Sequence, residues 1–506
     1  MMSAALGGAC GGLIDTRDAD PAPPSAPTDN ATIPDDAAAP TAPDAAPITV
    51  TVGHVRELRG VWISTVNNGT WPSKTALGAS AAKAELLTIF DALALAHMNT
   101  VFFQVRPESD ALYASALEPW SRFLSGVQGT DPGWDPLAFA VAEGHARGLE
   151  VHAWVNPYRG LANAAVTAAA NHVTRTLSKF AYVYGTPAVV WMDPGAPEVR
   201  AHIIAVLRDI VKRYDVDGIH FDDYFYPYPN GTPFPDASSY ALYTDAGGVL
   251  SLGDWRRDNV NTLVREASVM IAAERPDVRF GVSPFGIYRP GTPPGITGLD
   301  AYDAIYCDPV KWMAEGWVDY LVPQLYWPST KQGQEFGKLV TWWAGLAKGG
   351  RSVFAGHDLS LLGTSPAWPL DEFRTEMKLS RAERPRGLRG NVFFTARPLV
   401  DDKLGVRTAF LGEFWSSPSL TPPLATAQNA AFAPPRVTRG QGGDLGFAHD
   451  AEVRAYAVYR ESKGGYALSS LLPGPTAVMA HASGRWAVSA IDRRGTESRG
   501  VVVDLP

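Results

Sequence analysis

The sequence has few of the features that mark disulfide-stabilised, membrane-spanning or nucleic-acid-binding proteins. Only two cysteines, Cys10 and Cys307, occur among its 506 residues, and their contexts differ, so a disulfide framework is excluded. No run of 18 apolar residues exists, so no transmembrane helix is predicted. The net charge is -8 and no basic stripe follows the chain, which argues against a nucleic-acid partner.

Motifs of two common enzyme classes are also missing. No Gly-x-Ser-x-Gly segment occurs, so the nucleophilic serine of a typical α/β hydrolase is poorly supported. The Gly-rich turn that binds nucleotides in doubly wound sheets is absent too, and we expect no cofactor. Aromatic residues, in contrast, are plentiful: 15 Trp, 18 Tyr and 20 Phe. Most will fill the core, but aromatic faces also stack on sugar rings, so a polysaccharide is a natural partner.

The first 50 residues have the composition of an exported tail. Small residues just before Cys10 resemble the cleavage site of bacterial lipoproteins, which makes Cys10 a candidate for lipidation and the only expected membrane attachment. No positive region precedes it, so an incidental cysteine in an unstructured tail is the alternative. The segment 14–48 is rich in Ala, Pro, Asp and Thr and predicts a disordered tether. We therefore expect a secreted or lipid-anchored protein of the bacterial envelope.

From residue 55 to 418, short apolar runs alternate with amphipathic segments. Most runs are apolar on both faces, as buried parallel strands are. The eight predicted strands are 59–65, 100–106, 150–156, 216–222, 279–284, 320–326, 352–356 and 390–396. The predicted helices include 81–98, 197–214, 252–275, 335–347 and 370–383.

This alternation predicts a (β/α)8 TIM barrel, with an open doubly wound sheet as the alternative. The span exceeds the usual barrel, and the excess follows strand ends at 161–192, 227–253 and 288–310, where substrate-binding loops belong. Residues 428–506 carry short alternating strands and resemble a fibronectin type III-like β-sandwich, in which we see no chemistry. We expect a monomer.

The strongest chemical signal is the pair Asp222 and Asp223 at the end of the fourth predicted strand. Adjacent side chains on a strand point in opposite directions, so both reach one site only where the strand ends and the chain turns. Two close carboxylates repel, which raises one pKa and creates an acid near neutral pH. Glycoside hydrolysis needs such an acid beside a carboxylate. A cap or a surface ion pair is the alternative, but the aromatic residues that follow favour a site.

Other polar residues at predicted strand ends complete the candidate site. Asp110 is a possible second catalytic partner of the pair. Candidate substrate-binding residues are Gln104, Arg106, His152, Asn156, Tyr158, Asp193, Tyr224, Gln324, Tyr326 and Trp327, with Trp154, Trp191 and Trp327 as stacking candidates. A metal site built from His152, His220 and His357 is a weaker alternative, because no His-x-His pair marks the first strand.

Several segments together resemble the glycosyl-hydrolase-like family 10 of bacterial envelope proteins. They are 59–65, 99–107, 113–121, 129–137, 152–159, 217–227, 283–287 and 322–327, in the family's order. The resemblance implies a TIM barrel and export, and one branch of the family cuts peptidoglycan strands that have lost their peptides. Residues 217–224 also match the start of the chitinase strand motif, but His220 and Tyr224 replace its middle Asp and final Glu.

From the residues and this resemblance we expect a glycoside hydrolase acting on a β-linked amino-sugar polymer, with peptide-free peptidoglycan strands as the first candidate. Adjacent acids also occur in N-acetylhexosaminidases in which the substrate's acetamide attacks, and peptidoglycan sugars carry that group. The alternatives are a non-catalytic carbohydrate-binding protein and a hydrolase of another exopolysaccharide.

Overall fold

The computed structural model describes residues 47–427, 430–440, 443–480 and 483–506. Cys10 and the predicted tether up to residue 46 lie outside this part of the chain. Among the described residues, no helix is long and apolar enough to cross a membrane.

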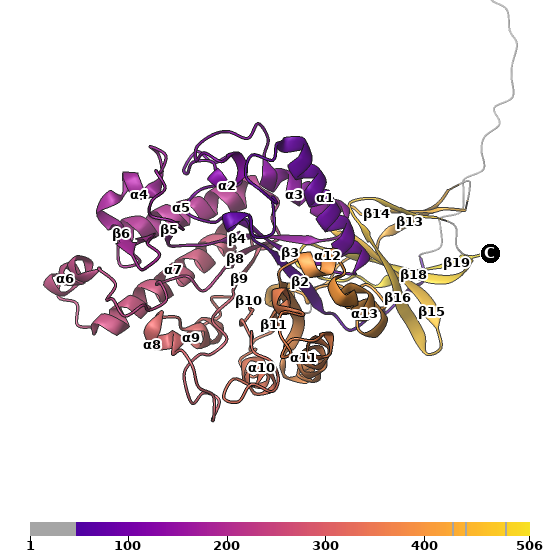
Figure 1. The fold of residues 1–506 in the computed structure, drawn as a ribbon. Coiled ribbons are helices and arrows are strands. Elements are labelled where there is room, and N and C mark those ends of the chain that lie inside the picture. The colour runs from indigo at the N-terminus through magenta and orange to yellow at the C-terminus, as the bar shows by residue number, and fades with distance from the viewer. Residues whose placement is uncertain (1–46, 428–429, 441–442, 481–482) are drawn as a thin grey trace, which may run out of the picture. The chain divides into compact units, whose positions relative to one another are not determined.

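A closed barrel of parallel strands forms the centre of the fold (Figure 1), which confirms the predicted barrel and all eight of its strands. Around the barrel the order is β10-β11-β12-β2-β3-β4-β8-β9. The strands are β2 (Leu58–Ile63), β3 (Thr100–Arg106), β4 (Glu150–Val155), β8 (Gly218–Phe221), β9 (Arg279–Val282), β10 (Tyr320–Leu321), β11 (Ser352–Asp358) and β12 (Leu388–Phe394).

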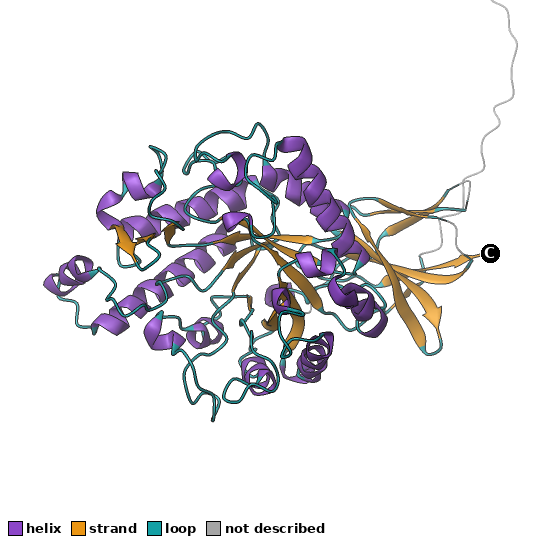
Figure 2. Ribbon diagram, in the orientation of Figure 1, coloured by secondary structure: helices purple, strands orange, loops and turns teal. Residues whose placement is uncertain are grey.

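Helices follow the strands and lie outside the barrel, as Figure 2 shows. They are α1 (Ala79–Leu95), α3 (Pro136–Ala146), α5 (Pro197–Arg213), α7 (Leu252–Glu274), α9 (Pro309–Ala314), α10 (Phe336–Ala344), α11 (Leu370–Ala382) and α13 (Val406–Glu413). Their apolar faces pack on the outer face of the strands in one large core. The amphipathic pattern therefore located the longer helices to within a few residues.

Strand β10 is shorter than the predicted 320–326 because of a proline. Pro323 has no backbone N–H and cannot donate to a parallel ladder. Pairing resumes at Gln324, which forms isolated bridges with Phe285 and Gly356. Gln324 thus stays in register at the end of the barrel even though the ladder is interrupted.

The long segments after the strand ends carry short elements of their own. After β4, three strands form an antiparallel sheet in the order β5-β7-β6. These strands are β5 (Arg159–Leu161), β6 (Ala181–Tyr184) and β7 (Val189–Met192). The short helices are α2 (Arg122–Ser125), α4 (Val173–Thr176), α6 (Ala237–Asp245), α8 (Ala301–Ala304) and α12 (Arg397–Val400).

The C-terminal part forms the predicted small β domain. Its strands are β13 (Arg436–Arg439), β14 (Leu445–Ala448), β15 (Ala455–Ser462), β16 (Gly465–Pro473), β17 (Ala477–Met479), β18 (Gly484–Ile491) and β19 (Gly500–Leu505). They form two antiparallel sheets, β1-β19-β18-β15-β16 and β13-β14-β17, around a shared apolar core. The edge strand β1 (Thr49–Val50) comes from the N-terminal side of the barrel, directly after the segment 14–48 predicted as tether.

Candidate active site

A cavity of about 410 Å³ opens at the end of the barrel where the strands finish, here called the carboxyl end. Catalytic sites of TIM barrels lie at this end. Its lining comes from β2, β3, β4 and β12 and from residues that follow β2, β4, β8, β9 and β10. The lining residues are Trp62, Ser64, Val66, Asn67, Gly69, Gln104, Trp154, Arg159, Asp222, Asp223, Tyr224, Ser283, Gln324, Tyr326 and Phe394.

Asp222 is buried in this cavity and has one occupied and one free carboxyl oxygen. Its Oδ2 accepts hydrogen bonds from Trp154 Nε1 at 3.0 Å and from Asn156 Nδ2 at 3.1 Å. Its Oδ1 finds no hydrogen-bond partner among the described residues. Burial raises the pKa of Asp222 to about 7, with Arg159 lowering it and the neighbouring Asp223 raising it. A protonated Oδ1 can therefore persist near neutral pH.

Asp223 is also buried, but both of its carboxyl oxygens accept hydrogen bonds. Gln324 Nε2 donates to Oδ1 at 3.0 Å, and the Tyr228 hydroxyl donates to Oδ2. Burial raises the pKa of Asp223, while these two donors counteract the rise because they stabilise the charged form. The two adjacent acids thus have different environments, one with a free oxygen and one with two donors.

Gln104 presents a free donor to the same cavity. Its Oε1 accepts from the backbone N–H groups of Thr65 at 2.8 Å and Val66 at 2.9 Å, which fixes the orientation of the amide. Its Nε2 is left buried and without a partner in the part of the chain that the structure describes. Because unpaired buried donors are costly, such a group is suited to a ligand's oxygen.

The structure brings five of the predicted binding residues to the two acids. Gln104, Tyr224, Gln324 and Tyr326 line the cavity, and Asn156 holds Asp222 from behind. Of the predicted stacking residues, Trp154 lines the cavity. These residues follow or end different strands. They were selected from the sequence because functional residues of TIM barrels lie at the carboxyl ends of the strands.

Arg106 and Asp110 lie outside the cavity lining. Arg106 donates to Glu118 with Nε and Nη2, the latter at 2.6 Å, and its Nη1 donates to the Asn156 carbonyl, so its guanidinium is committed to the fold. Asp110 accepts from Gln128 Nε2 at 3.1 Å. Burial and the nearby Glu108 raise the pKa of Asp110 to about 7. The sequence showed their position on the strand but not these partners.

The remaining predicted residues also lie away from the lining. His152 points into the barrel interior, where it contacts Tyr320, and Tyr158 is fully buried. Asp193 accepts from Gly195 N at 2.8 Å and from Ser239. Trp191 donates to the Phe225 carbonyl at 3.0 Å, and Trp327 packs edge-on against Phe285.

The three histidines of the metal alternative do not converge. His152 and His220 both contact the Tyr320 hydroxyl inside the barrel, whereas His357 lies between Glu376 and Asn391. Within the described ranges, no group of three or more His, Cys, Asp or Glu side chains could hold a metal ion.

Trp62 and Tyr228 are among the residues of the site that were not predicted from the sequence. Trp62 lines the cavity from β2, and its indole donates to His220. Its place in an apolar run suggested only a core residue, although the strand alternation puts it on the inner face with Leu58 and Gly60. Tyr228 was part of the aromatic run after the two acids, but nothing in the sequence singled it out as the donor to Asp223.

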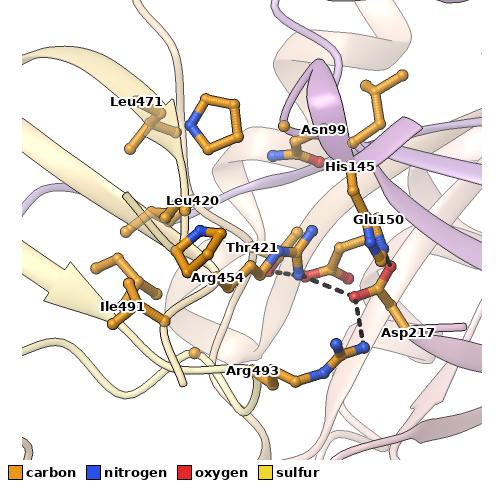
Figure 3. A pocket seen from close by; sticks show the side chains of 18 of the residues that line it. Asn99, His145, Glu150, Asp217, Leu420, Thr421, Arg454, Leu471, Ile491 and Arg493 are labelled. Carbon is orange, nitrogen blue, oxygen red and sulfur yellow. Dashed lines mark hydrogen bonds and ion pairs between the residues drawn. The ribbon is translucent and has the colours of Figure 1, made fainter. Parts of the chain in front are cut away.

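A second cavity, of about 460 Å³, lies at the opposite or amino end of the barrel, against the β domain (Figure 3). Glu150 and Asp217 face it from the barrel, and Arg454 and Arg493 from the β domain. Arg454 contacts Glu150 and lies 3.7 Å from Asp217, and Arg493 lies 3.8 Å from Asp217. These two acids lie beside arginines, which distinguishes them from Asp222 in the first cavity.

Comparisons with known proteins show what this chain is similar to. Residues 57–356 match the family described as glycosyl hydrolase-like 10. The chain is 36% identical over 428 residues to glycosyl hydrolase YngK of Bacillus subtilis, covering 80% of this chain and 83% of that protein. It is 32% identical over 404 residues to glycosyl hydrolase DigH of Escherichia coli, covering 73% and 90%. Among solved structures, the glycoside hydrolase domain of PgaB (BpsB) from Bordetella bronchiseptica aligns with a TM-score of 0.46 at 12% identity, covering 71% of this chain and 98% of that one.

Proposed function

Because the chain belongs to the glycosyl hydrolase-like 10 family, we propose that it hydrolyses glycosidic bonds in a β-linked amino-sugar polymer, with peptide-free peptidoglycan strands as substrate. The observation that carries the proposal is the asymmetry of the two adjacent acids. Asp222 has a free Oδ1 and a pKa near 7, whereas Asp223 accepts two hydrogen bonds. This is the division between acid and carboxylate that glycoside hydrolysis requires.

In the proposed mechanism Asp222 is the general acid. Its Oδ1–H donates a proton to the glycosidic oxygen as the bond to the anomeric carbon breaks. Trp154 and Asn156 hold the other oxygen, so the acid's direction is fixed. After the leaving sugar departs, the Asp222 carboxylate accepts a proton from the attacking water, which restores the acid.

Asp223 is the second carboxylate. We propose that it accepts the N–H of the substrate's acetamide and turns the acetamide oxygen toward the anomeric carbon, where that oxygen attacks. The positive charge that develops on the acetamide is stabilised by the adjacent carboxylate. Gln324 and Tyr228 hold both oxygens of Asp223 for this role. The free Nε2 of Gln104 supplies a donor for a sugar hydroxyl or carbonyl oxygen.

The test is cleavage of purified peptide-free glycan strands, read by mass spectrometry, by the parent protein and by Asp222→Asn and Asp223→Asn. We expect fragments from the parent and none from either variant. Asp110→Asn is a matched control, because Asp110 is also buried with a pKa near 7 but lies outside the cavity lining. Full activity in both cavity variants would refute the proposed acids, and binding without cleavage by the parent would favour a carbohydrate-binding protein.

Two further substrates sharpen the mechanism. Strands from which the acetyl groups have been removed should not be cleaved, because their amine has no carbonyl oxygen to attack. Substrates with an activated aryl leaving group need no protonation, so they should restore much of the activity of Asp222→Asn but not of Asp223→Asn. If the aryl substrates instead restored the activity of Asp223→Asn, Asp223 would be the general acid and Asp222 the carboxylate that orients the acetamide.

We also propose that the protein works in the bacterial envelope, where this polymer is found. Lipidation of Cys10 remains a prediction from the sequence. Incorporation of a labelled fatty acid into the full chain, compared with Cys10→Ala, is the measurement that tests it.

A further inference from the structure

The interior of the barrel contains a chain of polar side chains where an apolar filling is usual. Glu150 and His152 come from β4, His220 from β8, Tyr320 from β10 and Trp62 from β2. All five are buried, with exposed fractions of 3% or less. We call these five residues the axial chain, because it joins the amino end of the barrel to the cavity at the carboxyl end.

Four hydrogen bonds connect the axial chain. Trp62 Nε1 donates to His220 Nε2 at 3.1 Å, and His220 Nδ1 lies 3.2 Å from the Tyr320 hydroxyl. The same hydroxyl lies 2.8 Å from His152 Nδ1, and His152 Nε2 lies 3.2 Å from Glu150 Oε2. Every polar group in the chain therefore has a partner, which is the condition for burying such a network.

The direction of these bonds follows from the indole. An indole N–H can only donate, so His220 Nε2 accepts and its proton is on Nδ1, which donates to the Tyr320 oxygen. The Tyr320 O–H is then free to donate to His152 Nδ1, and His152 Nε2–H donates to Glu150. A charged His152 would instead leave the Tyr320 proton without an acceptor. Burial also lowers the pKa of His220 well below its usual value, consistent with a neutral ring.

Two glycines make room for these rings. A Cβ on Gly218 would lie 2.5 Å from His152 Nδ1, and a Cβ on Gly281 would overlap the Tyr320 ring. The barrel thus gives up side chains on β8 and β9 to accommodate the polar chain. An apolar filling of the same space would be simpler, so the arrangement calls for a role beyond packing.

The β domain anchors the amino end of the axial chain. Arg454, which directly precedes β15, contacts Glu150 Oε1. The Thr421 hydroxyl Oγ1 donates a hydrogen bond to the same oxygen at 2.5 Å. Arg279 Nε lies 3.5 Å from Glu150 Oε2. At the other end the chain finishes on Trp62, in the wall of the cavity. Because an indole N–H cannot accept a proton, the chain is unsuited to passing protons into the cavity and suited to holding a side chain in place.

We propose that the axial chain, anchored by Arg454 of the β domain, fixes the orientation of the Trp62 indole and thereby positions the glycan in the cavity. The inference rests on the proposed function for its kinetic consequence but not for its structural one. Tyr320 and Arg454 are positioning residues that act through Trp62. The β domain contributes to the site without touching the substrate.

A spectroscopic test needs no substrate. The hydrogen-exchange rate of the Trp62 indole N–H is measured by nuclear magnetic resonance on the folded protein, with the signal assigned by its loss in Trp62→Phe. Tyr320→Phe removes one hydroxyl from the middle of the chain, and we expect it to speed this exchange by about fivefold or more, the effect of weakening one hydrogen bond. An unchanged Trp62 signal in Tyr320→Phe would overturn the proposal.

The β-domain anchor is tested in the same way with Arg454→Met. Arg493→Met is the matched control, because Arg493 also joins the β domain to the acids of the amino end but does not contact the axial chain. We expect the hydrogen-exchange rate of the Trp62 indole N–H to increase in Arg454→Met and to stay unchanged in Arg493→Met. Equal changes in both would mean that the interface as a whole, and not the axial chain, controls Trp62.

Kinetics on glycan strands completes the test. Tyr320→Phe should raise KM several-fold with little change in kcat, whereas simple loss of folded protein lowers kcat and leaves KM unchanged. In a Trp62→Phe background the same substitution should have no further effect, and a full additional effect would contradict action through Trp62. If the parent cleaves no glycan, the proposed function fails. The exchange rate of the Trp62 indole N–H still tests whether the axial chain fixes the orientation of Trp62.

Discussion

Strand β8 has one aspartate directly before it and another directly after it, Asp217 and Asp222, and both are buried. At the amino end, Arg454 and a hydrogen bond from His145 keep the pKa of Asp217 far below its usual value despite burial. At the carboxyl end, burial prevails and the pKa of Asp222 rises to about 7. The same residue type, at opposite ends of one four-residue strand, thus has a pKa far below its usual value at one end and near 7 at the other.

The comparison shows that burial alone does not decide the charge of a carboxyl group. Desolvation disfavours the anion at both ends, and the difference lies in the cations and donors that approach it. Glu150 is a second example in which nearby cations outweigh burial, because Arg454 and Arg279 hold its pKa well below the usual value. The β domain therefore determines the chemistry of the amino end by supplying its arginine, while the carboxyl end stays free for a ligand.

The two ends of β8 should differ most when Asp217 and Asp222 are each replaced by the neutral asparagine. Asp222→Asn should lower kcat by about 10² to 10⁴, the contribution of a positioned acid, while the protein stays folded. Asp217→Asn should retain the turnover of each folded molecule and lose stability instead. Turnover of glycan strands and thermal unfolding of both variants are the measurements, and a loss of turnover in Asp217→Asn without unfolding would break the comparison.

Removing the cation at the amino end should be the largest effect on stability. Arg454→Met leaves Glu150 buried with one fewer partner, and losses of about 3 to 5 kcal/mol are typical when one member of a buried ion pair is removed. Denaturant unfolding of the parent and variant measures the difference. Arg436→Met is a suitable control, because its ion pair with Asp450 is exposed. Equal stability of Arg454→Met and the parent would mean that water replaces the arginine without cost.

The two ends should also respond to pH in opposite senses. In the proposed mechanism the reaction requires protonated Asp222, so kcat/KM should fall about tenfold per unit as the pH rises above about 7. Glu150 and Asp217 have lowered pKa values, so their stabilising contribution is complete above their usual pKa values of 4.5 and 3.8 and is lost as the pH falls through the folded-state values.

Asp222 acts on stability with the reverse sign. Its raised pKa means that folding becomes less favourable as the pH rises from about 4 to about 7. Asp222→Asn should therefore gain stability relative to the parent at pH 8, and the gain should vanish near pH 4. Thermal unfolding at both values measures it, and a gain that is independent of pH would show that Asp222 is ionised with no penalty.

The smallest effect is expected from a single donor to the second carboxylate. Tyr228→Phe removes the hydroxyl that donates to Asp223, so the pKa of Asp223 should rise and turnover at neutral pH should fall by about tenfold, the effect of one hydrogen bond to a charged group. Tyr182→Phe, whose hydroxyl contacts Asp193 outside the cavity lining, is the control. Similar losses in both variants would argue against a special role for Tyr228.

The eight strands and the position of the two acids could be predicted from the sequence because both depend on local pattern. Apolar runs define buried strands, and a polar residue at the end of such a run falls at the mouth of a barrel. The same rule placed Gln104, Gln324 and Tyr326 at the site. It could not show which carboxyl oxygen of Asp222 would stay free, because that depends on where Trp154 and Asn156 meet it in space.

The rest of the site depends on contacts between residues far apart in sequence. Arg106 has the sequence position of a binding residue, but Glu118 occupies its guanidinium. His152 has the position of a ligand or substrate contact, yet its partners are Glu150 and Tyr320. Trp62 reads as an ordinary core residue until its partner His220 is known. Local pattern selects positions, whereas the long-range partner decides whether a side chain serves the substrate or the fold.

The pairing of β1 with β19 has a mechanical consequence. Thr49 and Val50 precede the barrel in sequence but are bonded to Val501 and Gly500 at the edge of the β domain. Tension applied through the residues before 47 reaches this edge strand before it reaches the barrel. The hydrogen bonds between β1 and β19 therefore carry this load before the strands of the barrel do.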